Sequence, residues 1–596
     1  MNVTHASDRR LYWIGLGIVL AIYASLASIR YFTPDDLGKR DQERPVSYIA
    51  DVVQNGNWLC PRDALGGISS KPPMHPWIAA VASHAMGGLI RPAWMFPSLL
   101  AMLVASLTIY TVGRRRLGWE AALLAATTFL LCHIGVKMVG IVRTDALFGC
   151  IVLLNALAAL RVWETGRGWT LFWAIALVST LTKGPLGVIL AFTPLLAVWW
   201  ERGSGHPSPF RRGMLPGMFV WAAGSLGWLL SAWWAFGDEV IREVIGRELL
   251  RHAVIGDAGE MAITRFYAAP FYLLSRYAPW SFFTIAAIIR VIRRPAPDPS
   301  RRRFDRFLVC WILAGVVIFA LVGHQRSNLI FPLVAPSAWL AGSFLADMRW
   351  IRGPRRALVT ACVLAVTLVP ILGVVYGLLY PRDPAVRMGL AVKRMARGLL
   401  SDVGPEFPLL YAGAPLGLQL HQGIWRLYGT EEIACDLLGG PHPFFAAVGS
   451  KDRFLESCRT SGVTPHVVRL WEDDASDQSI AIVGNRDRLD WYDPMTGWMA
   501  PFAITFRGVR PLGGKSDYLD KAGILMNGGN FRIEELGGGL TIMNRSDRRA
   551  TIRLELQQGA RLWREEHTIE GGDELSLTWP DSTTGSPTPG IRPAAT

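Results

Sequence analysis

Long apolar stretches recur along the chain until about residue 380 and then stop. They predict membrane helices near 11–30, 93–112, 119–134, 146–162, 169–182, 185–200, 215–235, 277–292, 307–323, 329–346 and 357–379. A helix needs about 20 apolar residues to cross a bilayer, and several of these stretches are shorter, so the boundaries and the number, about eleven or more, stay open. The apolar segment 76–88 is too short to cross, and we expect an interfacial helix there.

After residue 380 the pattern becomes that of a soluble domain, which we expect to span 381–580. "FFAAVGSKDRFLESCRTSGVTPHVVRLW" reads as strand, helix and strand, so an α/β domain is predicted, with more strand character toward the end of the chain. Residues 581–596 have a disordered composition. Cys435 and Cys458 lie in this polar region and can form a disulfide if it is extracytoplasmic.

Composition supports a polytopic α-helical membrane protein. The 596 residues are 51% hydrophobic and only 18% charged, and a single soluble core of that hydrophobicity is not expected at this length. The net charge of +14 is spread over short basic clusters between apolar stretches, which is typical of cytoplasmic loops and argues against a nucleic-acid partner. The first apolar stretch is too long for a signal peptide and is predicted to stay as a membrane helix.

The basic clusters also predict the orientation of the chain. With the N-terminus in the cytoplasm, the clusters on the cytoplasmic side are Arg114–Arg116, Arg211 and Arg212, Arg290 to Arg306, and Arg349 to Arg356. The loops 31–75 and 236–275 and the domain after 380 then lie outside. In a bacterial inner membrane this side is the periplasm, and the membrane domain, 1–380, presents both long loops to it.

The outer loops hold more ionisable residues than solvation of a loop requires. "GKRDQERPVSYIA" brings Asp41, Glu43 and Arg44 together, and Lys71 follows in the stiff sequence "KPP". An acid beside a cation suits a general base next to a phosphate-binding group. Further candidates at the same face are Arg143 and Asp145 in "GIVRTDALFGC", Lys183 in "LTKGPLG", His324 and Arg326 in "GHQRSNLIFP", and Arg247 and Arg251 in the second loop. For each of these residues the alternative interpretation stays open, namely that it only solvates the loop or forms a structural ion pair.

Motifs for other chemistry are missing from the sequence. There is no nucleotide-binding glycine motif, no P-loop and no HExxH zinc motif, and His75, His84 and His133 are scattered. We therefore expect that no cofactor is required, and the sequence gives no indication of a divalent metal.

In their order along the chain, these motifs resemble the GT-C superfamily of membrane glycosyltransferases, specifically lipid A aminoarabinose transferases and protein O-mannosyltransferases. The strings that carry the resemblance are "RDQERP", "GNWLCPRD", "KPPMHPW", "RTD", "TKGP", "APWSFF" and "GHQRSNLIFP", within roughly 10–350. The chain departs from the family at three positions. Gln42 separates two acids that are adjacent in the family, Gln325 replaces a lysine and Leu329 replaces a tyrosine.

The resemblance implies an inverting transferase that moves a sugar from a polyprenyl-phosphate donor to a glycolipid, glycan or protein at the outer membrane face. Asp41, with Glu43 as the alternative, would be the general base, and Asp145 would orient the acceptor or act as a second acid. Cations would bind the donor phosphate. Those implied are Lys71, Arg44, Arg143, Lys183, Arg247, Arg251 and Arg326, while Trp58, His75 and Tyr267 are implied for the acceptor or sugar pocket. An oligosaccharyl ligase with a diphosphate-linked donor and a non-catalytic lipid-linked-sugar transporter are the alternatives.

Overall fold

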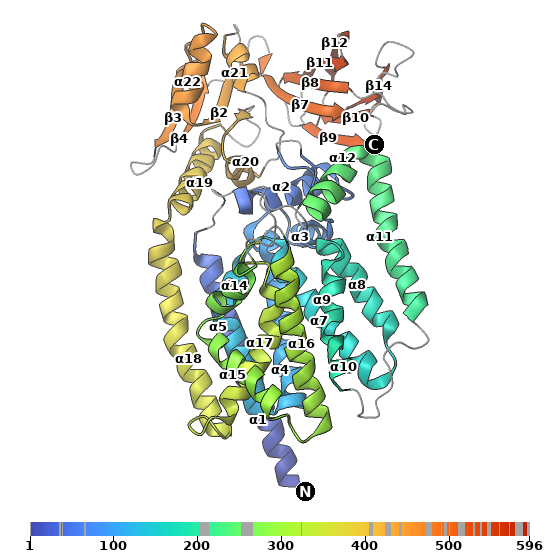
Figure 1. The fold of residues 1–596 in the computed structure, drawn as a ribbon. Coiled ribbons are helices and arrows are strands. Elements are labelled where there is room, and N and C mark those ends of the chain that lie inside the picture. The colour runs from blue at the N-terminus through green and yellow to red at the C-terminus, as the bar shows by residue number, and fades with distance from the viewer. Residues whose placement is uncertain are drawn as a thin grey trace.

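The computed structural model shows a domain of long helices below a smaller domain that carries the strands (Figure 1). The structure describes residues 2–34, 37, 40–64, 67–201, 214–251, 266–322, 325–403, 409–423, 431–439, 444–472, 479–489, 492–493, 498–499, 501–509, 519–527, 531–536, 539–544, 550–558, 561–570, 573–578 and 588–592.

Helices form in each of the eleven apolar stretches of the sequence. In chain order these are α1 (Asn2–Phe32), α4 (Arg91–Leu117), α5 (Trp119–Leu131) with α6 (His133–Gly140), α7 (Thr144–Thr165), α8 (Trp169–Lys183), α9 (Leu186–Phe192) with η1 (Thr193–Leu196) and α10 (Ala197–Trp200), α11 (Met214–Phe236), α15 (Trp280–Arg293), α16 (Pro299–Leu321), η4 (Phe331–Leu333) with α17 (Val334–Asp347), and α18 (Pro354–Val374) with η5 (Val375–Leu379) and η6 (Tyr380–Arg382).

Six helices of the described part of the chain are long and apolar enough to cross a membrane, or seven if the bent pair α5 and α6 forms one span. The remaining apolar helices are shorter; α8, for example, has 15 residues. The larger number of spans expected from the sequence therefore stays a prediction, whereas a helical membrane domain is confirmed.

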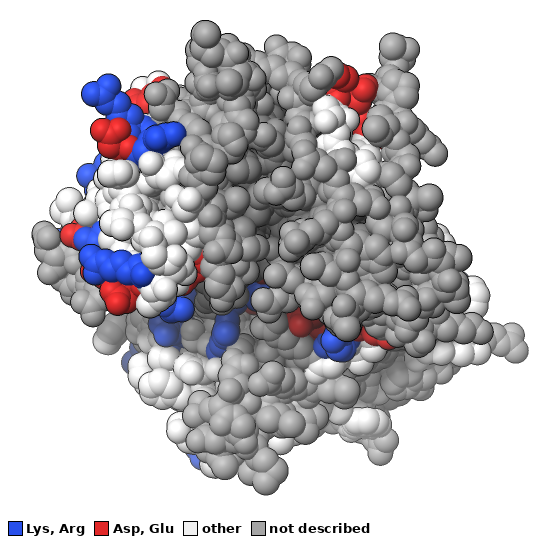
Figure 2. Space-filling view, turned by 90° about the horizontal axis from the view of Figure 1, so that it is seen from above, with Lys and Arg blue, Asp and Glu red and all other residues white. Residues whose placement is uncertain are grey.

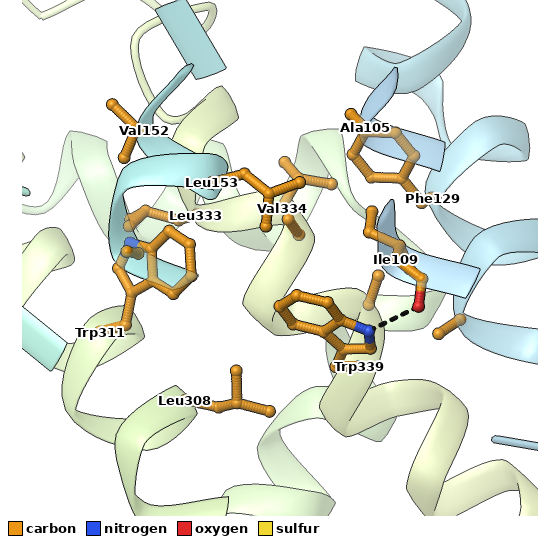
Figure 3. Packing of buried hydrophobic residues seen from close by; sticks show 14 of the residues in the cluster. Ala105, Ile109, Phe129, Val152, Leu153, Leu308, Trp311, Leu333, Val334 and Trp339 are labelled. Carbon is orange, nitrogen blue, oxygen red and sulfur yellow. Dashed lines mark hydrogen bonds between the residues drawn. The ribbon is translucent and has the colours of Figure 1, made fainter. Parts of the chain in front are cut away.

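The core of the helical domain lies between α4, α5, α7, α16 and α17 (Figure 3). Trp339 of α17 is fully buried, and its indole Nε1 donates a hydrogen bond to the carbonyl oxygen of Ile109 at 2.8 Å. The backbones of α5 and α17 approach closely, since a Cβ atom on Gly342 would lie 2.5 Å from the carbonyl oxygen of Ala121. Packing at interior density therefore fixes the helices that carry the candidate site.

Shorter elements lie between the two domains in Figure 1: α2 (Arg40–Asn55), α3 (Met74–Ala85) and α12 (Asp238–Val240). The chain continues from α12 into a π-helix, η2 (Ile241–Arg251), and α14 (Ala268–Arg276) precedes α15. Most of α3 falls in the segment 76–88, where the sequence predicts a short helix. Helix α2 makes part of the first long loop, 31–75, helical and places its residues at fixed positions.

The domain after residue 380 begins with an amphipathic helix, α19 (Pro384–Val403), and then alternates strands and helices. Its elements are β1 (Leu409–Ala412), α20 (Gly417–Gln422), α21 (Glu431–Leu438), β2 (Phe445–Gly449), α22 (Lys451–Thr460), β3 (His466–Glu472) and β4 (Ser479–Gly484). The sheet order is β1-β2-β4-β3, and only β1 and β2 run parallel among these pairs. Cys435 and Cys458 form a disulfide between α21 and α22.

The remaining strands form antiparallel sheets. They are β5 (Tyr492–Asp493), β6 (Trp498–Met499), β7 (Pro501–Val509), β8 (Leu519–Asn527), β9 (Phe531–Leu536), β10 (Gly539–Asn544), β11 (Ala550–Gln558), β12 (Arg561–Ile569), β13 (Glu574–Thr578) and β14 (Thr588–Arg592). Strand β14 lies in the segment 581–596, where composition predicts disorder, and it pairs with β13 so that Ile591 faces Leu575. The increase in strand content toward the end of the chain agrees with the sequence pattern.

Candidate functional site

A buried acid surrounded by cations lies at the start of α7. Asp145 is 3% exposed, and its Oδ1 atom lies 2.5 Å from Nζ of Lys183 at the end of α8. Its Oδ2 atom lies 3.3 Å from Nε of Arg143. The charges of "RTD" and "TKGP", far apart in the sequence, therefore meet at one point, and both cations are largely buried with it.

Local sequence places these side chains at helix ends. Arg143 is the extended residue that precedes α7, and Asp145 stands in the first turn, where the helix dipole stabilises a negative charge. Lys183 is the last residue of α8, and the chain leaves that helix through Gly184, which has φ of +75°. This backbone conformation suits glycine, so the Lys-Gly-Pro sequence ends the helix with its cation at the turn.

Lys71 and His75 complete the surroundings of Asp145. The charges of both Asp145 and Lys71 act on the imidazole of His75, and the charge of Lys71 also acts on Asp145. Burial lowers the pKa of His75 to about 4, so its ring is neutral near pH 7. Three cations, Lys71, Arg143 and Lys183, thus surround one buried carboxylate.

Helix α2 is attached to this cluster through Gln42. The buried Gln42 accepts a hydrogen bond at Oε1 from the backbone N–H of Val142, 2.9 Å away and next to Arg143. The residue that separates the two acids therefore connects α2 to the start of α7. Asp41 lies one position earlier in α2, but its side chain is outside the described part of the structure.

Glu43 contacts the C-terminal domain. It is 5% exposed, and its Oε1 atom accepts a hydrogen bond of 3.1 Å from the backbone N–H of Gly417, the first residue of α20. Close contact at this junction is built into the sequence, because a Cβ atom on Gly417 would lie 2.5 Å from the carbonyl oxygen of Leu37. The structure thus gives Glu43 a structural contact with the C-terminal domain.

Arg44, predicted as a phosphate ligand, is paired with an acid that the motif analysis did not single out. Its Nε atom lies 2.8 Å from Oδ2 of Asp63, a carboxylate that is 1% exposed. The other carboxylate oxygen of Asp63 accepts the N–H of Gly67, 3.0 Å away. Arg44 therefore helps to shape the loop that leads to Lys71. In the sequence, only the string "PRD", which ends at Asp63, could have drawn attention to this acid.

Asp51 is the second acid that sequence reasoning missed. It is fully buried on α2 and accepts hydrogen bonds from the side chains of Asn55 and Asn57 and from the backbone N–H of Arg62. Burial raises the pKa of the Asp51 carboxyl from 3.8 to about 6, against these hydrogen bonds, which lower it. In the sequence, only the nearby Asn55 and Asn57 could have indicated that Asp51 accepts hydrogen bonds.

Arg62 connects the two long loops, 31–75 and 236–275. Its Nη2 atom lies 3.4 Å from Oε2 of Glu239 in α12, and its guanidinium lies over the ring of Phe236, 5.7 Å from the centroid. Since Asp51 holds the backbone of Arg62, the loop that delivers Lys71 is tied both to α2 and to the segment that enters η2.

The structure records no contact between Asp145 and the other predicted site residues that it describes. Tyr267 is 62% exposed and Trp58 is 39% exposed, with the Trp58 ring stacked against that of His84. Arg326 is exposed in the turn before η4. The side chains of Arg247 and Arg251 and the whole of His324 lie outside the described part of the structure.

Among the described residues, no group of three or more His, Cys, Asp or Glu side chains could hold a metal ion. The side chains around Asp145 are cations, which suit an anionic ligand such as a phosphate.

Comparison with known proteins identifies the architecture. Residues 70–223 match the family model described as dolichyl-phosphate-mannose-protein mannosyltransferase. The structure is similar to ArnT from Cupriavidus metallidurans bound to undecaprenyl phosphate, with a TM-score of 0.64 and 16% identity over 80% of this chain and 98% of that chain. The chain has a GT-C membrane glycosyltransferase fold.

The apo state of the same ArnT matches this GT-C fold with a TM-score of 0.62 and 16% identity, over 81% of this chain and 99% of that chain. An oligosaccharyltransferase from Archaeoglobus fulgidus gives a TM-score of 0.40 and 13% identity, over 76% of this chain and 68% of that chain. None of the curated proteins matches the chain by sequence. The likeness to ArnT confirms, at the level of the fold, the resemblance inferred from the motifs. The segment 70–223 that matches the family model contains Lys71, Asp145 and Lys183.

Proposed function

We propose that this protein is an inverting glycosyltransferase that uses a polyprenyl-phosphate sugar and works at the outer face of the membrane. The observation that carries the proposal is the buried Asp145, held by Arg143 and Lys183 with Lys71 beside it. This cluster gathers three cations around one buried carboxylate. It suits a phosphodiester whose negative charge increases as the sugar departs and the lipid phosphate monoester forms.

In the proposed reaction, the carboxylate of Asp41 takes the proton from an acceptor hydroxyl. The acceptor oxygen forms a bond to the anomeric carbon while the bond from that carbon to the phosphate oxygen breaks. The electron pair of that bond stays on the lipid phosphate, where Lys71 and its neighbouring cations stabilise the added charge. General-base assistance of this kind contributes about 10²–10⁴-fold to the rate.

The outer location of the site agrees with the disulfide between Cys435 and Cys458. Such bonds persist in oxidising compartments and are rare in the cytosol. The undecaprenyl phosphate bound to the ArnT of similar fold supports a lipid-linked donor, because this chain shares that architecture along most of its length.

The proposal is tested with purified protein and two labelled donors, a polyprenyl-phosphate sugar and a polyprenyl-diphosphate sugar. We expect the wild-type protein to release polyprenyl phosphate from the first donor when envelope glycolipids or glycans are supplied, and Lys71→Gln to lower the rate about 100-fold. Lys451→Gln changes a lysine in the C-terminal domain and serves as the control. Release from the diphosphate donor alone would instead identify an oligosaccharyl ligase, and transport of an intact donor without release would identify a transporter.

A further inference from the structure

A groove lies between α19 and β3 in the C-terminal domain, apart from the residues around Asp145. Its volume is about 220 Å³. The lining residues that matter here are Arg394, Met395 and Leu399 from α19 and Arg469, Leu470 and Trp471 from β3. The volume is below the roughly 300–1,000 Å³ of sites for drug-sized ligands, so the groove suits a single sugar residue.

The groove has rigid walls. Val392, Ala396 and Leu399 of α19 are buried in a core shared with β1, β2 and β4. Strand β3 is an edge of its sheet and pairs with β4 alone among the described strands. Because the helix packs on the sheet beside an open edge, three consecutive residues of β3 reach the groove. A site on a helix and a strand holds its side chains more firmly than a site on loops.

The charge of the groove favours an anion. Arg394 is exposed and forms no ion pair within the described part of the chain. Arg469 pairs through Nη2 with Asp402 in the last turn of α19, which orients its guanidinium and offsets its charge. Seen from above, basic and acidic side chains lie close together on the left of Figure 2, where α19, α22, β3 and β4 lie in Figure 1, and further charged side chains lie toward the right. Two arginines and one acid leave the groove with a net positive charge.

Trp471 adds a flat apolar surface beside these arginines. Its side chain is partly buried, packs against the core below the groove and also lines the groove. The face of an indole ring is rich in π electrons and apolar, which suits the C–H face of a sugar ring. A guanidinium that binds a phosphate in a bidentate manner can sit next to such a surface.

We propose that this groove binds a phosphorylated monosaccharide unit, with the sugar ring on Trp471 and the phosphate on Arg394 and Arg469. If the protein is the transferase proposed above, this unit belongs to the head group of the acceptor, which then is a phosphorylated glycan or glycolipid. That assignment rests on the proposed function, whereas binding in the groove does not require transfer activity.

The test measures binding to the full-length protein in nanodiscs by isothermal titration calorimetry, with glucose 1-phosphate, glucose and inorganic phosphate as separate probes. We expect glucose 1-phosphate to bind at least tenfold more tightly than either glucose or inorganic phosphate. Equal affinity for inorganic phosphate would overturn the saccharide assignment. No binding of glucose 1-phosphate would overturn the site.

Variants locate the binding. Arg394→Gln removes a charge-assisted hydrogen bond, and we expect about a tenfold loss of affinity for glucose 1-phosphate. Trp471→Leu keeps an apolar side chain and is expected to weaken binding of the sugar phosphate but not of inorganic phosphate. Arg397→Gln is the matched control, because Arg397 is an exposed arginine of α19 that does not line the groove. Lys71→Gln distinguishes the two proposals, because it is expected to lower transfer about 100-fold and leave binding in the groove unchanged. Wild-type affinity in Arg394→Gln would contradict the groove assignment.

Discussion

At the scale of single residues, Asp145 and Lys183 form a buried ion pair whose two halves depend on each other. The side chains are 3% and 7% exposed. Removing one partner of such a pair costs about 3–5 kcal/mol, because the other charge stays buried. We expect Lys183→Met to lower the thermal unfolding temperature in detergent strongly. Asp145→Asn with Lys183→Met should recover part of that loss. Lys451→Met, which breaks an exposed pair with Glu472, is the control and should leave the unfolding temperature nearly unchanged.

Asp51 makes a separate prediction about pH. Burial raises the pKa of its carboxyl from 3.8 to about 6. Because the folded value lies above the unfolded value, the contribution of Asp51 to stability is fully present below pH 3.8 and is lost as the pH rises through about 6. We expect Asp51→Asn to flatten the fall in unfolding temperature between pH 4 and pH 7, whereas Asp452→Asn, at an exposed acid, leaves it unchanged. A fall of the same size in Asp51→Asn would refute this.

At the scale of elements, helix α2 carries both candidate bases, Asp41 and Glu43, and a contact to the next domain. Glu43 accepts the N–H of Gly417, whereas Gln42 holds the start of α7. If Asp41 is the base, Glu43→Gln keeps an acceptor oxygen for Gly417 and should retain transfer within about threefold. Asp41→Asn should lose about 10²-fold or more. Initial rates of both variants decide between the two acids, and the reverse order would make Glu43 the base.

The same helix shows how far sequence reasoning reaches. Apolar stretches predicted the helices of the membrane domain, because a helix that crosses lipid needs a long, continuous run of apolar residues. Ordered motifs predicted that Lys71, Asp145 and Lys183 belong together. The roles of Asp51, Asp63 and Arg62 could not be predicted, because each depends on a tertiary contact with a backbone amide or a distant side chain. Composition suggested disorder for 581–596, but the pairing of β14 depends on β13 and not on local propensity.

At the scale of the whole molecule, the disulfide tests the predicted orientation. Cys435 and Cys458 are 23 residues apart, and closing a loop of this size contributes about 3 kcal/mol. We expect both thiols to resist a maleimide reagent in denatured cell extracts until a reductant is added. Cys60, a free buried cysteine of the first outer loop, should react on denaturation alone. Full labelling of Cys435 and Cys458 without reductant would place the domain in a reducing compartment.

We propose that the cluster around Asp145 serves the transfer of a sugar from a polyprenyl phosphate. It is tested most directly with the purified chain in liposomes, a labelled polyprenyl-phosphate sugar and an envelope glycolipid fraction. Mass spectrometry then measures the glycosylated acceptor and the released polyprenyl phosphate. We predict that the two products form in equal amounts with the wild-type chain and fall about 100-fold with Lys71→Gln. If the folded wild-type chain transfers no sugar with any envelope fraction, or if Lys71→Gln leaves the rate unchanged, this role of the cluster around Asp145 is refuted.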